Sequence, residues 1–337
     1  MKLPRRQFLH LAAGATALPA LSRIARAQAY PTRPVRLIAT FSAGGVVDLV
    51  ARLIAQWLSE RLGETFIVEN RAGAGGNIGT EAVVRAPADG YTLLFVTAAN
   101  AINTTFYEKL NFDFSRDIAP IASIVRLPFV MLVNPSVPAK TVPEFIAYAR
   151  ANPGKLTMAS GGIGTSTHVA GELFKMMTGV NLVHVPYRGL ALSLTDLLGG
   201  QVQVAFASTV SSIEYVKTGR LRALAVTAAT RSDALPDVPT VDEFVPGYEA
   251  SIWFGIGAPK NTPTEIVDKL NNEINAAFAD PNMKARLAEL GGTALPGSSA
   301  DFAKLIADET EKWGKVIQAA NIVRSEGPFT GISRGVL

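Results

Sequence analysis

The sequence predicts an α/β chain of two lobes, in which each lobe is a mostly parallel sheet flanked by helices. The length of 337 residues suits two domains of roughly 100 to 200 residues each. Short β-rich runs alternate with helical patterns, as they do in βαβ units. A strand, a glycine loop and a helix also occur together twice, at residues 37–53 and 156–173.

The first lobe is expected to combine residues 28–128 with residues 250–337. Its strands are predicted at residues 35–40, 65–69, 91–97 and 252–257. Apolar side chains recur at helical spacing between Leu49 and Leu62, and Gly63 follows as a C-terminal stop. Further helices are predicted from Glu265, Met283 and Asp301.

The second lobe is expected to span residues 129–249. Its strands are predicted at residues 129–133, 156–160, 182–185, 202–207 and 224–227. Thr141 begins a helix, because Glu144 stands three places later and Pro143 suits the first turn. The proline-rich passage at residues 235–246 is either a hinge between lobes or a surface loop within one lobe.

The positive charge of the chain is concentrated at its start. The formal net charge is +4, yet residues 1–27 hold five basic residues and no acidic one. The rest of the chain has 27 basic and 28 acidic residues, so it lacks the basic field that nucleic acid requires. The absence of cysteine excludes disulfides and thiolate metal sites.

Residues 1–27 have the pattern of an export signal. A basic start precedes an apolar stretch from Leu9 to Leu21, and the small-residue pattern Ala25-Arg26-Ala27 predicts cleavage before Gln28. The pair Arg5-Arg6 resembles a twin-arginine signal, although an ordinary secretory signal with two arginines is the alternative. We therefore expect a periplasmic protein, and we expect a monomer.

The two glycine loops suggest two anion sites. Helix N-termini present free N–H groups and a favourable dipole, and ligands of parallel α/β sheets lie beyond the carboxyl ends of strands. In the first loop, Ala43, Gly44 and Gly45 are predicted to supply N–H donors. Asp48 either contacts the ligand or only complements the helix dipole.

The second loop follows Ser160 and combines hydroxyl groups with a helix start. Its predicted ligand contacts are Gly164, Thr165, Ser166, Thr167 and His168. The alternative role of Ser166 or Thr167 is that of an N-cap, and one loop can do both.

Three more residues are candidates for the same cleft. Tyr187 and Arg188 end a predicted strand, and the guanidinium suits a second carboxylate. Asn100 follows the strand at residues 91–97, where turn formation is its alternative role.

Cofactor, metal and catalytic patterns are absent from the sequence. The glycine run at residues 73–79 is out of register with a dinucleotide fingerprint. His168 and His184 are too far apart in sequence to form a recognised metal pair, and Ser160, Ser166 and His168 do not form a nucleophile elbow. No cofactor, no metal and no enzymatic activity are expected.

Several motifs in order resemble the Bug-type solute receptors of tripartite tricarboxylate transporters. The likeness covers the chain from Tyr30 to about Ile322. The motifs are Phe41-Ser42-Ala43-Gly44-Gly45, Val68-Glu69-Asn70-Arg71, Ala88-Asp89-Gly90-Tyr91, His168 through Phe174, His184-Val185-Pro186-Tyr187-Arg188-Gly189 and Leu235-Pro236-Asp237-Val238-Pro239.

The resemblance implies a periplasmic binding protein of type II-like, two-lobed fold that closes around a small carboxylate. It assigns the binding loops to residues 43–48 and 164–168, with Tyr187, Arg188 and Ser208 nearby. Family members often have histidine in place of Asn100 and an acidic residue followed by asparagine in place of Ala207 and Ser208. The loss of that acid argues against an amino-acid ligand and favours a dicarboxylate, tricarboxylate or aromatic carboxylate.

The implied partners are membrane permease subunits of a tripartite transporter. Two alternatives stay open from the sequence. One is an exported hydrolase, and the other is a receptor that signals instead of feeding a permease.

Overall fold

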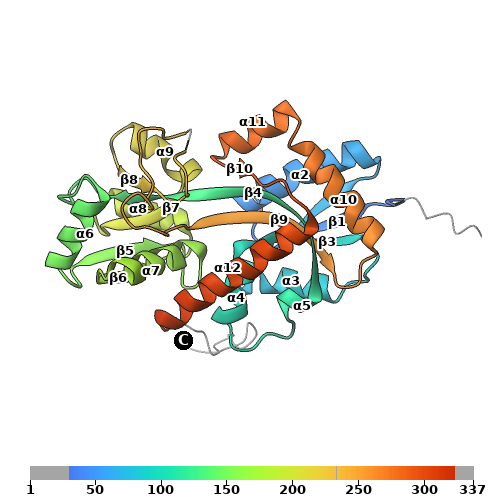
Figure 1. Cartoon of the computed structure of the whole chain (residues 1–337), viewed down its shortest axis with the longest axis horizontal. Helices are drawn as coiled ribbons and strands as arrows, with labels where there is room; N and C mark the ends of the chain where they lie inside the picture. The colour runs from blue at the N-terminus through green and yellow to red at the C-terminus, as the bar shows by residue number, and fades with distance from the viewer. Residues whose placement is uncertain (1–29, 233, 323–337) are drawn as a thin grey trace, which may run out of the picture.

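One continuous sheet of ten strands runs through both lobes of the protein (Figure 1). The computed structural model describes residues 30–232 and 234–322. The main strand order is β2-β1-β3-β9-β4-β7-β5-β6, while β8 and β10 both pair with β4. The export signal predicted at residues 1–27 lies outside the described residues.

The first lobe is built on three parallel strands at one end of the sheet. These strands are β1 (Val35–Ala39), β2 (Phe66–Asn70) and β3 (Thr92–Thr97). The helices that follow them are α2 (Val46–Leu62), the 3-10 turn η1 (Ala74–Gly76) with α3 (Asn77–Val84), α4 (Ala98–Phe106) and α5 (Phe114–Asp117). The three strands predicted here are confirmed within two residues at each end.

The second lobe repeats this arrangement at the other end of the sheet. Its parallel strands are β5 (Leu156–Ser160), β6 (Leu182–Pro186) and β7 (Val204–Ser208). Its helices are α6 (Val142–Ala151), α7 (Ser166–Thr178), α8 (Leu190–Leu198) and α9 (Thr209–Lys217). The predicted cap of α6 is present, because Thr141 Oγ1 accepts from Glu144 N at 3.3 Å.

Two long strands in the middle of the sheet join the lobes by antiparallel pairing. Strand β4 (Ile118–Val133) pairs with β9 (Ser251–Pro259) as far as Pro128. From Phe129 onward it pairs with β7 and with β8 (Arg222–Val226). The two-lobed α/β fold is thus confirmed, with parallel pairs on the outside and antiparallel pairs at the centre.

The sequence predicted only the last five residues of β4. The longer strand contains prolines at 120 and 128, which are unusual within a strand because proline cannot donate to a ladder. In the structure Pro120 lies beside a shift in register, and Pro128 is the last residue paired with β9 before the strand changes partner. Both prolines therefore sit where the ladder is already interrupted.

The proline-rich passage is a loop attached to β8. Val226 N donates to Pro239 O at 2.8 Å, and Val241 N donates to Val226 O at 2.9 Å. The surface-loop interpretation holds here, because β4 and β9 supply the connection between lobes.

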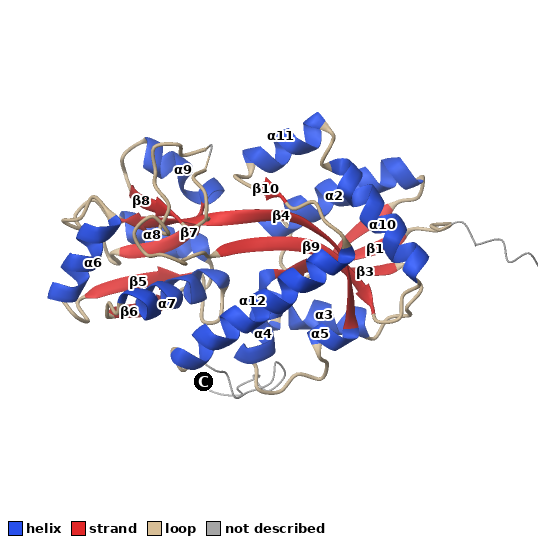
Figure 2. Cartoon of the chain, viewed as in Figure 1, coloured by secondary structure: helices blue, strands red, loops and turns tan. Residues whose placement is uncertain are grey.

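The C-terminal segment returns to the first lobe and then crosses the molecule. It contains α10 (Thr264–Ala277), α11 (Pro281–Glu289), β10 (Thr293–Ala294) and α12 (Ser299–Ala319). Helix α12 contacts α4, β4 and α7 and extends along one side of the sheet toward the second lobe (Figure 2). The three predicted C-terminal helices are confirmed.

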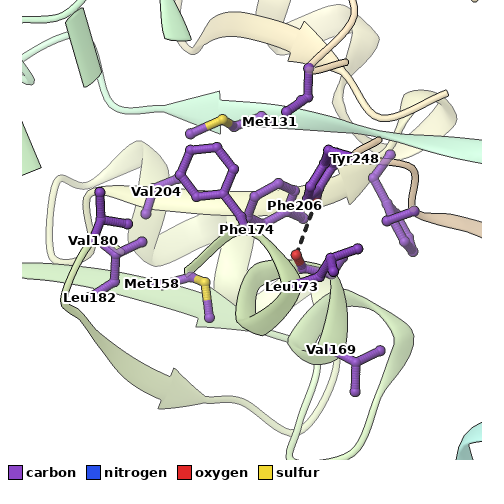
Figure 3. Close-up of a cluster of buried hydrophobic side chains, with 14 of the residues drawn as sticks. Met131, Met158, Val169, Leu173, Phe174, Val180, Leu182, Val204, Phe206 and Tyr248 are labelled. Carbon is purple, nitrogen blue, oxygen red and sulfur yellow. Dashed lines mark hydrogen bonds between the residues drawn. The ribbon is translucent and has the colours of Figure 1, made fainter. Parts of the chain in front are cut away.

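Each lobe has its own buried apolar cluster. In the second lobe, Phe174 of α7 packs between Met131 of β4, Phe206 of β7 and Tyr248 (Figure 3). The Tyr248 hydroxyl donates to Ala170 O at 3.0 Å, which satisfies its one polar group inside this cluster. The cluster fixes α7 and therefore the loop that precedes it.

Candidate functional site

A cavity of about 540 Å³ lies where the first turns of α2, α4 and α7 meet beside β9. Residues from both lobes line it: Phe41, Val46, Val47, Ala74, Gly75, Thr97, Ala99, Asn103, Phe106, Tyr107, Gly161, Gly162, Ile163, Gly164, Thr165, Ser166, Thr167, Leu190, Ile252 and Phe254. This size suits a small organic molecule.

The first glycine loop joins β1 to α2 and is held by Asp48. Gly44 has a left-handed φ of +82°, and its N–H donates to Asp48 Oδ2 at 2.9 Å. The same carboxylate accepts from Asn70 Nδ2 at 3.0 Å and forms an ion pair with Arg52 at 3.0 Å. The hydrogen bond from Arg52 lowers the pKa of Asp48 to about 2.

Asp48 consequently stabilises its own loop. Its side chain is buried and does not line the cavity, because all its oxygen atoms face Gly44, Asn70 and Arg52. Ala43, Gly44 and Gly45 are exposed and lie outside the cavity wall. The wall begins instead at Val46 and Val47, whose N–H groups have no acceptor within the described residues.

The second glycine loop joins β5 to α7 and lines the cavity directly. Gly164 has a left-handed φ of +76°, and its N–H donates to His168 Nδ1 at 3.1 Å. Thr165 is the N-cap of α7 and also donates to Gly162 O at 2.7 Å. Thr167 Oγ1 accepts from Gly161 N at 3.0 Å. Predicted contacts Gly164 to Thr167 therefore all belong to the cavity wall.

The first turn of α7, which lines the cavity, has unpaired donors. Among the residues that the structure describes, the N–H groups of Ser166 and Thr167 have no protein acceptor. The Ser166 hydroxyl likewise has no partner in that part of the chain. These groups supply partial positive charge at the cavity wall without a basic side chain.

His168 lies behind the loop, not in the cavity. It is buried and stacks on His184 with ring centroids 3.7 Å apart. Ser160 Oγ lies 2.7 Å from His184 Nε2 and also accepts from Gly162 N at 3.1 Å. Burial lowers the pKa of His184 to about 4, assisted by the nearby His168 and Lys175.

Ser160 and His184 form the serine–histidine contact that a hydrolase requires, but the pair is sealed from the cavity. Ser160 is completely buried and its hydroxyl is committed to the loop. The pair at Ser166 and His168 makes no mutual hydrogen bond, since His168 Nδ1 accepts from Gly164 and its Nε2 lies 3.6 Å from Glu172. Ser160 thus has an adjacent base but no access to the cavity, whereas Ser166 borders the cavity but lacks the adjacent base that nucleophilic catalysis needs.

Four other predicted residues stand outside the cavity wall. The Tyr187 hydroxyl donates to Asp196 Oδ2 at 2.6 Å, and Arg188 is exposed. Asn100 is buried in the capping box of α4, where its amide also donates to Thr80 Oγ1 at 2.8 Å. Ser208 begins α9 and lies 2.7 Å from Ser211 Oγ. Local capping and pairing thus explain Tyr187, Asn100 and Ser208, whereas Arg188 is simply exposed.

The sequence analysis did not predict the apolar side chains of the cavity wall. The missed side chains are Phe41, Val46, Val47, Phe106, Ile163, Leu190, Ile252 and Phe254. In a single sequence such residues are indistinguishable from core positions. Ile163 is the exception, because an isoleucine within a glycine loop is recognisable in the sequence. In the structure this residue is 58% exposed.

This fold and this cavity define a two-lobed solute-binding protein. The chain belongs to the TctC family, described as tripartite tricarboxylate transporter family receptors, whose profile matches residues 50–322. Among the part of the chain that the structure describes, none of the helices combines the length and the apolar character needed to cross a membrane.

Solved structures of relatives agree with this assignment. A protein of R. palustris, Rpa4515 with adipate, is 39% identical and has a TM-score of 0.78 over 87% of this chain and 99% of its own. The periplasmic binding protein BugD is 35% identical, with a TM-score of 0.75 over 87% and 99%. MatC from Rhodopseudomonas palustris with bound malate is 29% identical, with a TM-score of 0.74 over 86% and 100%. The resemblance to Bug-type receptors is therefore confirmed.

Proposed function

We propose that this protein is a receptor for a small organic carboxylate, which binds in the cavity between the first turns of α2, α4 and α7. The observation that carries the proposal is the set of unpaired N–H groups at Val46, Val47, Ser166 and Thr167. Charge-assisted hydrogen bonds to such groups hold an anion without a buried cation. The relatives with adipate and with malate support this class of ligand.

Delivery to membrane permease subunits is the second part of the proposal. The family description supports it, and so does the name of the periplasmic relative BugD. We propose that residues 28–128 with 250–337 and residues 129–249 close on the ligand as two lobes. The exported protein begins near Gln28 in this proposal. Purified protein added to membrane vesicles that contain the permease should be required for carboxylate uptake.

Proline substitution tests the N–H donors directly. Ser166 is the first residue of α7, where proline is well tolerated, and Thr165 already has the extended backbone (φ −74°, ψ 159°) that precedes proline. Ser166→Pro therefore removes the N–H donor together with the hydroxyl while preserving the helix. Ser166→Ala keeps the N–H group and is the matched control for loss of the hydroxyl.

The expected results separate binding from folding. Titration calorimetry against adipate, malate, citrate and benzoate should show at least one ligand for the native protein. Ser166→Pro should lower the affinity for that ligand by about 10- to 100-fold, which corresponds to the loss of one or two charge-assisted hydrogen bonds. The Tm should be unchanged. Unchanged affinity in Ser166→Pro would place the anion elsewhere, and no binding by any organic acid would refute the receptor proposal.

A further inference from the structure

The polar side chains of the cavity wall are almost all committed to the protein. Asn103 Nδ2 donates to Gly75 O and to Asn77 Oδ1, both at 2.9 Å. Thr165 and Thr167 bond to the loop and lie 3.1 Å from each other. The Thr97 hydroxyl takes part in the capping box of α4. These bonds hold the wall together. Among the described residues, Asn103 Oδ1 and the Ser166 hydroxyl are the wall's side-chain polar atoms without a protein partner, so most of its polar side chains have little capacity left for a ligand.

The donors that stay available are gathered at helix starts. They are the N–H groups of the first turns and the Ser166 hydroxyl, and all of them suit a carboxylate. Among the described wall residues there is no Asp or Glu for a ligand ammonium, and no Lys, Arg or His for a further carboxylate.

Between these helix starts the wall is apolar. It presents Phe106, Ile163, Leu190, Ile252 and Phe254, together with the side chains of the first turn of α2. A hydroxyl or ammonium group on the body of a ligand would lose its water there without finding a partner. Such desolvation is costly, whereas a methylene or aromatic carbon gains from the same contact.

We propose that the ligand is an acid with an unsubstituted hydrocarbon body, either an alkyl chain or an aromatic ring, and with one or two carboxylates at its ends. Amino acids, hydroxy acids and tricarboxylates are rejected because the apolar side chains between the helix starts give their extra polar groups no partner. This inference rests on the proposed carboxylate function and narrows it to one chemical class.

Matched ligand pairs test the inference on the native protein. The pairs are succinate and malate, glutarate and glutamate, adipate and 2-aminoadipate, and phenylacetate and mandelate. Each pair differs by one hydroxyl or one amino group at constant chain length. In every pair that binds, the unsubstituted acid should bind at least about 10-fold more tightly. Equal or tighter binding of the substituted partner would overturn the inference and leave the carboxylate function standing.

A variant of the wall sharpens the test. Ile252→Thr places a hydroxyl on β9 at a position that keeps a β-branched side chain suited to a strand. The ratio of malate to succinate affinity should rise about 5- to 10-fold in this variant. Ile67→Thr on β2 is the matched control, since Ile67 is 48% exposed and outside the cavity wall.

Each outcome has a distinct meaning. An unchanged ratio in Ile252→Thr would show that the ligand body does not contact this wall, which contradicts the inference. Because the ratio is measured within one variant, a loss of stability does not affect it. If none of the eight acids binds but citrate does, this inference fails and the carboxylate function stands. If neither these acids nor citrate or benzoate binds the native protein, both fail.

Discussion

The two glycine loops have the same backbone arrangement but are held by different side chains. In each loop a glycine with left-handed φ donates its N–H to the side chain four residues later, in the first turn of the following helix. The acceptor is the carboxylate of Asp48 in the first lobe and the imidazole Nδ1 of His168 in the second. The ion pair with Arg52 holds the side chain of Asp48 in place, and stacking on His184 holds the ring of His168.

The two loops differ in how much room they leave for a larger side chain at the glycine. The loop before α2 faces solvent at Gly44, and an added Cβ there meets nothing within 4 Å. The loop before α7 is packed against α4, and an added Cβ at Gly164 would lie 2.7 Å from the Phe106 ring. The second loop is therefore the more restricted of the two, and it also lines more of the cavity.

The largest expected difference is between alanine substitutions of the two glycines. Both residues have positive φ, which costs a non-glycine residue about 1 to 2 kcal/mol. Gly164→Ala adds the clash with Phe106, so it should lose about 3 kcal/mol or more in total and bind its ligand over 100-fold more weakly, on the order of 3 kcal/mol. Gly44→Ala should lose only the backbone contribution.

Urea unfolding and calorimetry on both variants provide the measurement. Equal losses of stability at Gly44 and Gly164 would contradict the unequal packing of the loops. A loss of affinity in Gly44→Ala as large as that in Gly164→Ala would show that the first loop is equally close to the ligand.

An intermediate loss of ligand affinity is expected when the hydrogen-bond acceptor at His168 is removed. His168→Asn places an oxygen where Nδ1 stood and keeps an acceptor for Gly164 N–H, whereas His168→Phe keeps a stacked ring and removes the acceptor. Affinity should fall about 10-fold in the phenylalanine variant and be largely retained in the asparagine variant.

Hydrogen exchange at residues 161–167 gives a readout that needs no ligand. The amide of Gly164 should exchange faster in His168→Phe than in the native protein or in His168→Asn. The reverse order would show that stacking, and not the hydrogen bond, orders the loop.

The smallest effect expected is a pH dependence confined to the second loop. Folding lowers the pKa of His184 from 6.5 to about 4, so the unfolded chain takes up this proton first as the pH falls. Stability should therefore decline between about pH 6.5 and pH 4. Asp48, with its pKa lowered to about 2, stays ionised and partnered across that range.

Melting temperature against pH tests this difference. The native Tm should fall by a few degrees over that window, and His184→Gln should flatten the slope. An identical slope in the variant would assign the acid sensitivity to other groups.

The sequence predicted those elements whose signals are local. Thr141 with Glu144 marked the start of α6, and Gly63 marked the end of α2 with its left-handed φ of 78°. The first eleven residues of β4 were missed. They contain Pro120 and Pro128, which are atypical of a strand, and only the tertiary partners show that the ladder is interrupted at both.

The candidate site was predictable at the level of loops but not of side chains. Repetition of strand, glycine loop and helix located both helix starts that border the cavity. It did not show that Asp48 and His168 turn back toward their own glycines, since a side chain that binds a loop and one that binds a ligand have the same local sequence. Phe254 and Ile252 were missed because a strand residue beside a cavity has the same local sequence as one in the core.

The pair of strands shared by both lobes also provides an intrinsic optical reporter. Trp253 lies on β9, and its indole N–H donates to Glu309 Oε2 at 3.1 Å, the oxygen that also accepts from Trp313 at 2.7 Å. Any torsion of the ribbon formed by β4 and β9 moves one indole relative to the other across a single carboxylate. We therefore expect tryptophan emission to report the proposed closure of the lobes without an added dye.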